Sequence, residues 1–210
     1  MRSPILLFTQ PLRFLRPRGR HSPIWSAFLA LTLVGLLPLD GLAEEVTLPA
    51  GKQMELLAKV ADYDRSFQQR AGARARVVLL VKPNDGDSLR TATQMQAVLS
   101  HIDAVGGLPH DDIIEAYKSA PAVADLCRTQ HVAILVVGPG FRTDIEAIRA
   151  ALDGVDVLSV TAVADYVAKG IVLGFDLVGG HPKMLVHLTQ ARRQNVAFTS
   201  DVLRLMQVYQ

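Results

Sequence analysis

Short apolar runs alternate with segments of helical periodicity along this sequence, and the alternation constrains the fold more than any other feature. Residues 77–81 are entirely apolar, as are residues 132–137, and a third run at 155–160 is interrupted only by Asp156 and Ser159. Strands that are apolar on both faces are typical of a parallel sheet that is covered on both sides. The sequence therefore predicts an α/β three-layer sandwich with a mostly parallel central sheet.

The expected elements can be placed from periodicity and from turn residues. Before the hairpin we expect a helix or a broken pair of helices at 53–69, a strand at 77–81, a long amphipathic helix from its N-cap Ser88 to Gly106-Gly107, a strand at 112–116, a helix at 121–129, a strand at 132–137, a helix at 143–152 and a strand at 155–160. Segments 171–177 and 184–188 flank Gly179-Gly180, which predicts a C-terminal antiparallel hairpin at one edge of the sheet. Two short helices follow, and the second begins at its N-cap Ser200 and carries an apolar stripe through Met206.

The N-terminal 43 residues have the pattern of a secretory signal peptide. Four arginines between residues 13 and 20 precede an apolar run at 24–39, and Gly41-Leu42-Ala43 offers small residues for cleavage. The run is shorter than the roughly 20 residues that a membrane-spanning helix needs. We therefore expect a signal peptide at 1–43, cleavage after Ala43, and one domain at 44–210 that is periplasmic or secreted. An uncleaved signal anchor is the alternative, and it also places the domain outside the cytoplasm.

The charge of the chain is concentrated in this leader. The full sequence has 22 basic and 20 acidic residues, but five of the basic residues and only one acidic residue lie within residues 1–43. The remaining chain has 17 basic and 19 acidic residues, so it has no excess positive charge to attract a phosphate backbone. We expect neither nucleic acid nor an anionic membrane surface as a partner.

Three loops follow neighbouring predicted strands at the carboxyl edge of the sheet, where open α/β folds bind ligands. If the loops converge, a hydroxyl, two helix N-termini and two cationic side chains would suit a small anion such as a carboxylate or phosphate. The alternative is that Gly138-Pro139-Gly140 is a tight turn and Ser88 an ordinary cap. The candidate ligand-binding residues are Lys82, Ser88, Gly138, Gly140, Arg142 and Thr161.

No motif indicates catalysis, a metal or a cofactor. The glycine-rich turn matches neither a P-loop nor a dinucleotide-binding fingerprint, and the histidines lack the spacing of metal ligands. No Gly-x-Ser-x-Gly elbow is present. Cys127 is the only cysteine, and its place near the end of a predicted helix suggests a small buried packing residue. We expect no enzyme activity and no cofactor.

The C-terminal half nevertheless carries a recognisable order of motifs. Leu126-Cys127, the strand 131–137, Val157 to Thr161, Asp165-Tyr166, Lys169-Gly170-Ile171, the glycine hairpin, His187-Leu188, Ala191-Arg192, Phe198-Thr199-Ser200 and Val202 to Leu205 follow one another in this sequence. This order resembles the YfiR-like family over about residues 75–210. One departure is His187, where the family's strand typically ends in Ile-Asn.

The resemblance implies an exported bacterial domain that is similar to one lobe of a periplasmic binding protein. It also implies a non-enzymatic regulator that binds the periplasmic part of a membrane signalling protein, such as a diguanylate cyclase, and restrains it. The family's redox response through cysteine pairs does not carry over to a chain with one cysteine, although Cys127 could join two chains. The alternative function is a small-anion receptor that uses the three loops. A homodimer through the hairpin strand is a further expectation.

Overall fold

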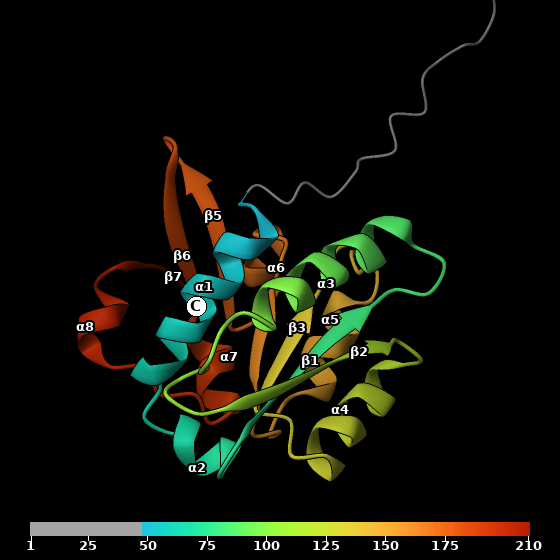
Figure 1. Ribbon diagram of the computed structural model, residues 1–210, viewed down its shortest axis with the longest axis horizontal. Coiled ribbons are helices and arrows are strands. Elements are labelled where there is room, and N and C mark those ends of the chain that lie inside the picture. Colours follow the sequence, from blue (N-terminus) through green and yellow to red (C-terminus); the bar gives the residue numbers. More distant parts are fainter. Residues whose placement is uncertain (1–47) are drawn as a thin grey trace, which may run out of the picture. The chain divides into compact units, whose positions relative to one another are not determined.

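A seven-stranded sheet organises the part of the chain that the computed structural model describes, residues 48–210 (Figure 1). Helices and strands alternate through most of its length, as the sequence predicts. The elements are α1 (Ala50–Val60), η1 (Ala61–Tyr63), α2 (Phe67–Ala71), β1 (Ala75–Val81), α3 (Gly86–Leu99), β2 (His110–Ala116), α4 (Ala120–Thr129), β3 (Ile134–Val137), α5 (Ile145–Ala151), β4 (Leu158–Thr161), α6 (Asp165–Ala168), β5 (Leu173–Val178), β6 (His181–His187), α7 (Leu188–Arg193), α8 (Ser200–Leu203) and β7 (Met206–Tyr209).

The strand order is β2-β1-β3-β4-β5-β6-β7. Strands β2, β1, β3, β4 and β5 run parallel, β6 returns antiparallel to β5, and β7 pairs parallel to β6. The predicted α/β class, the mostly parallel sheet and the C-terminal hairpin are thereby confirmed. Gly179 and Gly180 form the turn with φ of +58° and +79°, a backbone conformation that favours glycine at both positions.

Successive residues of each central strand pack into different cores. Val77 and Leu79 of β1 face the core beneath α1 and α3, whereas Val78 and Leu80 face the core beneath α4 and α5. Both faces of the sheet are therefore covered, and this explains why the central strands are apolar without interruption. Helices α1 and α3 lie side by side on one face (Figure 1).

Two predicted helix caps are wrong. Asp85, not Ser88, caps α3, because its carboxylate accepts a hydrogen bond from the Ser88 backbone N–H at 2.9 Å. The Ser88 hydroxyl instead accepts from the Lys82 N–H. Helix α3 also ends at Leu99, before the glycine pair, and Thr199 rather than Ser200 precedes α8.

The predicted edge position of the hairpin is also wrong. Strand β7 pairs with β6 from Met184 to His187 and takes the edge of the sheet itself. The apolar spacing of Val202 and Met206 suits a helix, but α8 ends at Leu203 and the chain becomes extended from Met206. The prediction thus placed residues of β7 in a helix.

A buried ion pair ties the N-terminal helices to the C-terminal segment. Arg70 contacts the Asp64 carboxylate at 2.7 Å, and both side chains are almost fully buried. The same guanidinium donates to Asp156 and to the carbonyl of Asn195. Asp64 also accepts from the Ala197 N–H. The bonds to Asn195 and Ala197 join segments that lie more than 100 residues apart in the sequence.

Predictions about residues 1–43 lie outside the described residues. The signal peptide, cleavage after Ala43 and the boundary of the mature domain therefore stay predictions. Within residues 48–210, none of the helices has both the length and the apolar character that crossing a membrane requires.

Candidate functional site

The loops after β1 and β3 meet at the carboxyl edge of the sheet, as expected for loops that follow two adjacent parallel strands. A Cβ placed on Gly140 would lie 3.2 Å from Lys82 Cβ, and one on Gly138 would lie 3.4 Å from the Ser88 hydroxyl. Gly140 has a φ of +90°, so glycine suits both the backbone and the close approach. Four of the six candidate residues thus come together. Thr161 lies at the end of β4, two strands from β1.

Most polar groups of this predicted anion site bond within the chain. The buried hydroxyls of Ser88 and Thr161 accept from the backbone N–H groups of Lys82 and Val163. Arg142 is exposed and also interacts within the protein. An incoming anion would therefore compete with existing partners, and anion binding at these loops stays a prediction.

Lys82 is the most strongly engaged of these residues. Its ammonium pairs with the Asp144 carboxylate at 2.5 Å and lies over the Tyr117 and Phe141 rings. The hydrogen bond from Lys82 lowers the pKa of Asp144. Burial, followed by the charge of Asp144, raises the pKa of Tyr117. The positive charge of Lys82 is thus balanced by an anion of the chain itself.

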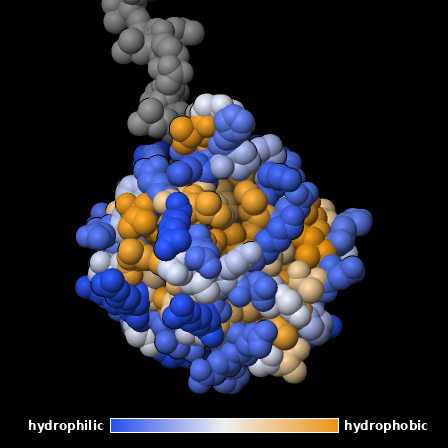
Figure 2. Space-filling model, turned by 90° about the vertical axis from the view of Figure 1, so that its left-hand side faces the viewer, coloured by the Kyte–Doolittle hydropathy of each residue, from blue (hydrophilic) through white to orange (hydrophobic). Residues whose placement is uncertain are grey.

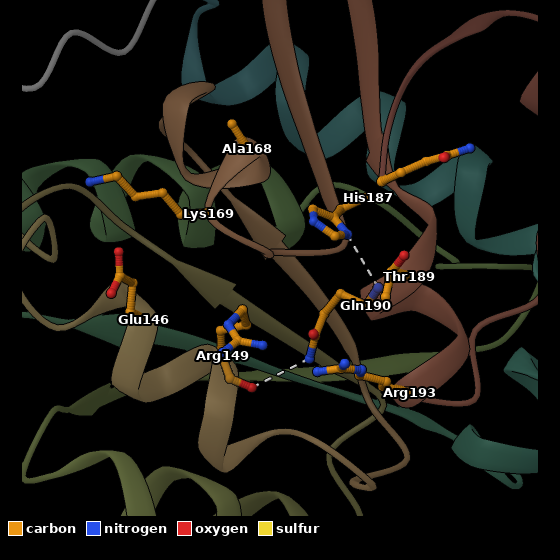
Figure 3. A pocket seen from close by; sticks show the side chains of 9 residues that line it. Glu146, Arg149, Ala168, Lys169, His187, Thr189, Gln190 and Arg193 are labelled. Carbon is orange, nitrogen blue, oxygen red and sulfur yellow. Dashed lines mark hydrogen bonds between the residues drawn. The ribbon is translucent and has the colours of Figure 1, made fainter.

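A different pocket lies near the amino end of β5, where β6 finishes. The His187 N–H donates to the Val172 carbonyl at 2.9 Å, which places the end of β6 beside the residue before β5. Side chains from α5, α6, β6 and α7 surround a cavity of about 430 Å³ (Figure 3). It is lined by Glu146, Arg149, Ala168, Lys169, His187, Thr189, Gln190, Arg193 and Gln210. A smaller cavity of about 190 Å³ lies between β2 and α4.

The larger pocket is rich in cationic side chains. Arg149, Lys169 and Arg193 line it, and Glu146 is the one acidic side chain among its lining residues. Only Arg193 has an ion-pair partner among residues 48–210, because Asp153 binds it at 2.8 Å. The sequence analysis missed this pocket, because its residues come from four separated segments that only the folded hairpin and α7 bring together. The pair Arg192-Arg193 is the one local signal in the sequence.

Apolar side chains are exposed along the open edge of the sheet and at the hairpin tip. Leu205 and Val208 lie next to and within β7, and Leu177 and Val178 lie at the end of β5. Apolar side chains gather among polar ones on the side of the molecule where Figure 1 shows α8 and β7 (Figure 2). The surface formed by the exposed side chains of Leu205 and Val208 is called the β7 edge below.

Sequence comparison finds a family model that matches part of this chain. Residues 116–207, from the end of β2 into β7, match the model described as YfiR/HmsC-like. This part of the chain is therefore similar to the YfiR/HmsC-like family. The YfiR-like resemblance is thereby confirmed, and this family comprises periplasmic regulators of diguanylate cyclases. No curated protein is significantly similar to the sequence.

Solved structures share the fold of this chain at low sequence identity. A conserved domain protein from Vibrio cholerae aligns with a TM-score of 0.55 and 10% identity, over 77% of this chain and 60% of that chain. An ABC domain in complex with L-Trp from Streptococcus pneumonia aligns with a TM-score of 0.53 and 13% identity, over 76% of this chain and 60% of that chain. This chain thus spans about 60% of each. The likeness to one lobe of a periplasmic binding protein is confirmed at the level of the fold.

His187, where the resemblance noted in the sequence leads to the expectation of an asparagine, caps α7. Its Nδ1 accepts a hydrogen bond from the Gln190 N–H at 3.2 Å, which is a bond that an asparagine side chain also makes at an N-cap. We expect His187→Asn to leave the free energy of unfolding within about 0.5 kcal/mol, and His187→Ala to lower it by about 1 kcal/mol at pH 7.5. Urea denaturation checks both values.

The cap should also depend on pH. Burial, followed by the charges of Arg149 and Arg193, lowers the pKa of His187 from 6.5. As the pH falls, the unfolded chain therefore takes up a proton at this histidine before the folded chain does. The contribution of His187 to the free energy of unfolding is present above about pH 6.5, and it is lost as the pH falls through the lower pKa of the folded state. We expect the His187→Asn variant to lose less free energy of unfolding than the wild type does when the pH falls from 7.5 to 5.5. Equal losses in the two proteins would contradict this role.

Cys127 lies on the buried face of α4 as a small core residue. It is 2% exposed, and burial raises its pKa to about 12. A bond from Cys127 to a second chain would therefore require α4 to move, and the native fold does not favour that role. At pH 8 we expect an aromatic disulfide reagent to react with the folded protein at least about a thousandfold more slowly than with the chain in urea, because the thiolate is the nucleophile. Comparable rates would show that the thiol is accessible.

Proposed function

We propose that this protein is a non-enzymatic, exported regulator that binds the periplasmic part of an inner-membrane diguanylate cyclase and restrains it. The observation that carries the proposal is the β7 edge, which lies at the C-terminal end of the region that matches a family of periplasmic diguanylate cyclase regulators. The signal pattern at residues 1–43 supports export, and cleavage after Ala43 would release the domain to the periplasm.

Two features suit the β7 edge to a protein partner. As the terminal strand of the sheet, β7 has one side whose backbone groups pair with no strand of the described residues, and an extended segment of a partner can add to such a strand. Leu205 and Val208 are 63% and 43% exposed beside these backbone groups. Exposed apolar side chains next to an open strand supply both area and hydrogen-bonding groups for a partner.

Charge substitutions on the β7 edge test the proposal. The full-length chain is expressed, purified and used as bait with inner-membrane extract, and the captured proteins are identified by mass spectrometry. The variant Leu205→Asp, Val208→Asp places two carboxylates on the surface without touching the core. Leu89→Asp is the matched control, because Leu89 is 52% exposed on α3. We expect the wild type and the control to capture a membrane protein with a diguanylate cyclase domain, and the double variant to lose at least about nine-tenths of it.

Each result has a distinct meaning. Capture of no cyclase by the wild type would contradict the proposed function. Equal capture by the wild type and the double variant would instead show that the cyclase binds elsewhere, so the β7 edge would not be the docking surface. A homodimer through the hairpin strand also remains a prediction, although β7 pairs with that strand from Met184 to His187. The mass of the purified protein in light scattering tests it.

A further inference from the structure

Two half-buried cations in the pocket between α5, α6 and α7 lack a counter-charge. The side chains of Arg149 and Lys169 make no hydrogen bond or ion pair with any other residue in the described part of the chain. By contrast, Arg90 and Arg128 on exposed helix surfaces pair with Asp87 and Asp125. A partly buried cation that has no acidic partner favours the binding of an anion next to it.

The backbone holds Arg149 in this pocket. Gly170, between α6 and β5, has a φ of +99°, and a Cβ there would lie 2.2 Å from Arg149 Cδ. The Arg149 side chain therefore lies directly over the glycine. On the other side, the Arg149 carbonyl accepts from the Gln190 amide, whose nitrogen also donates to Asp153. Both contacts fix α5 against α7.

His187 adds a neutral donor to the two cations. Its Nδ1 accepts from the Gln190 N–H, so in the neutral ring the proton is on Nε2. That second ring nitrogen faces the pocket (Figure 3). Arg149, His187 and Arg193 line the same pocket, so these groups converge on it. Two cations and one N–H donor around a single cavity form a suitable set of donors for carboxylate or phosphate oxygens.

We propose that this pocket binds a small organic anion that carries carboxylate or phosphate groups, with Arg149 and Lys169 as its charged contacts and His187 Nε2 as a donor. The cavity of about 430 Å³ falls within the usual range for small-molecule sites. Glu146, at the same pocket, disfavours a ligand that places negative charge beside it. The site is separate from the predicted three-loop site and from the β7 edge, and it does not depend on the proposed function.

Calorimetry with two simple anions tests the site. The full-length chain is purified and titrated with citrate and, separately, with inorganic phosphate, at a constant ionic strength set with sodium chloride. The test variant is Arg149→Gln, Lys169→Gln. The control variant, Arg90→Gln, Arg128→Gln, removes the same charge from exposed helix surfaces outside the pocket. Thermal unfolding without ligand verifies that each variant is folded.

We expect at least one of the two anions to bind the wild type with 1:1 stoichiometry. The test variant should bind it at least about tenfold more weakly, because two charge-assisted contacts are lost, and the control variant should bind it as the wild type does. Binding of citrate alone identifies a carboxylate site, and binding of phosphate alone identifies a phosphate site. Absence of binding to the wild type, or equal weakening in the test and control variants, would overturn the proposal.

Discussion

Replacing Arg70 with methionine is expected to lower the free energy of unfolding by about 3–5 kcal/mol. Methionine fills much of the space but leaves the Asp64 carboxylate without its cation, and the Asp64 side chain has no exposed surface. An uncompensated charge in such a place is strongly destabilising. The variant also loses the bonds to Asp156 and to the Asn195 carbonyl, which hold the C-terminal segment against α2. Urea denaturation at pH 7 measures the change.

Two further variants separate charge from packing. Asp64→Asn combined with Arg70→Met removes the buried charge, so we expect the double variant to recover about half of the loss. Arg74→Met is the matched control, since Arg74 is 54% exposed and its contact with Asp111 is long, at 3.8 Å. That change should cost less than about 0.5 kcal/mol. A loss below about 1 kcal/mol for Arg70→Met would contradict the role given to the pair.

The second large effect is expected at Gly106, in the turn between α3 and β2. Its φ is +56°, and a Cβ there would lie 2.3 Å from Cε1 of the buried Phe67 ring. Alanine would therefore combine a strained backbone with displacement of a core aromatic ring. We expect Gly106→Ala to lower the free energy of unfolding by about 2–4 kcal/mol. Thermal or urea unfolding measures it.

Gly154 offers a control that isolates the backbone component. Its φ is +75°, but a Cβ there meets nothing within 4 Å. Gly154→Ala should therefore cost only the conformational penalty, about 1–2 kcal/mol. The excess loss at Gly106 then reports on Phe67. Equal losses at the two glycines would show that the Phe67 ring moves aside without cost.

The central strands were predicted correctly because they are buried on both faces of the sheet, so nearly all of their residues are apolar. Val77 to Val81 is apolar throughout because its residues enter two cores in turn. The hairpin turn could also be predicted, because it needs a positive φ at two successive positions and the sequence has glycine at both, Gly179 and Gly180. Strand β7 was not predicted because its four residues form too short a pattern to indicate a strand, whereas the spacing of Val202 and Met206 is typical of a helix.

The candidate sites differ in the same way. Lys82 and Gly140 follow adjacent parallel strands, so their convergence could be predicted from the order of the strands. Arg149, Lys169 and His187 converge only because β6 folds back along β5 and brings α7 against α5. A single-sequence pattern carries no information on that packing. The sequence shows that His187 departs from the expected Ile-Asn end of the strand, and the structure shows that this histidine caps α7.

The measurement that tests the central claim most directly is the cellular concentration of cyclic di-GMP, the product of a diguanylate cyclase. Cells that lack this protein are complemented with the wild type, with Leu205→Asp, Val208→Asp, or with Leu89→Asp. A restraining regulator predicts that loss of the protein raises cyclic di-GMP. The wild type and Leu89→Asp should then restore the lower level, whereas the β7 edge variant should not. An unchanged concentration of cyclic di-GMP in cells without the protein would contradict the account.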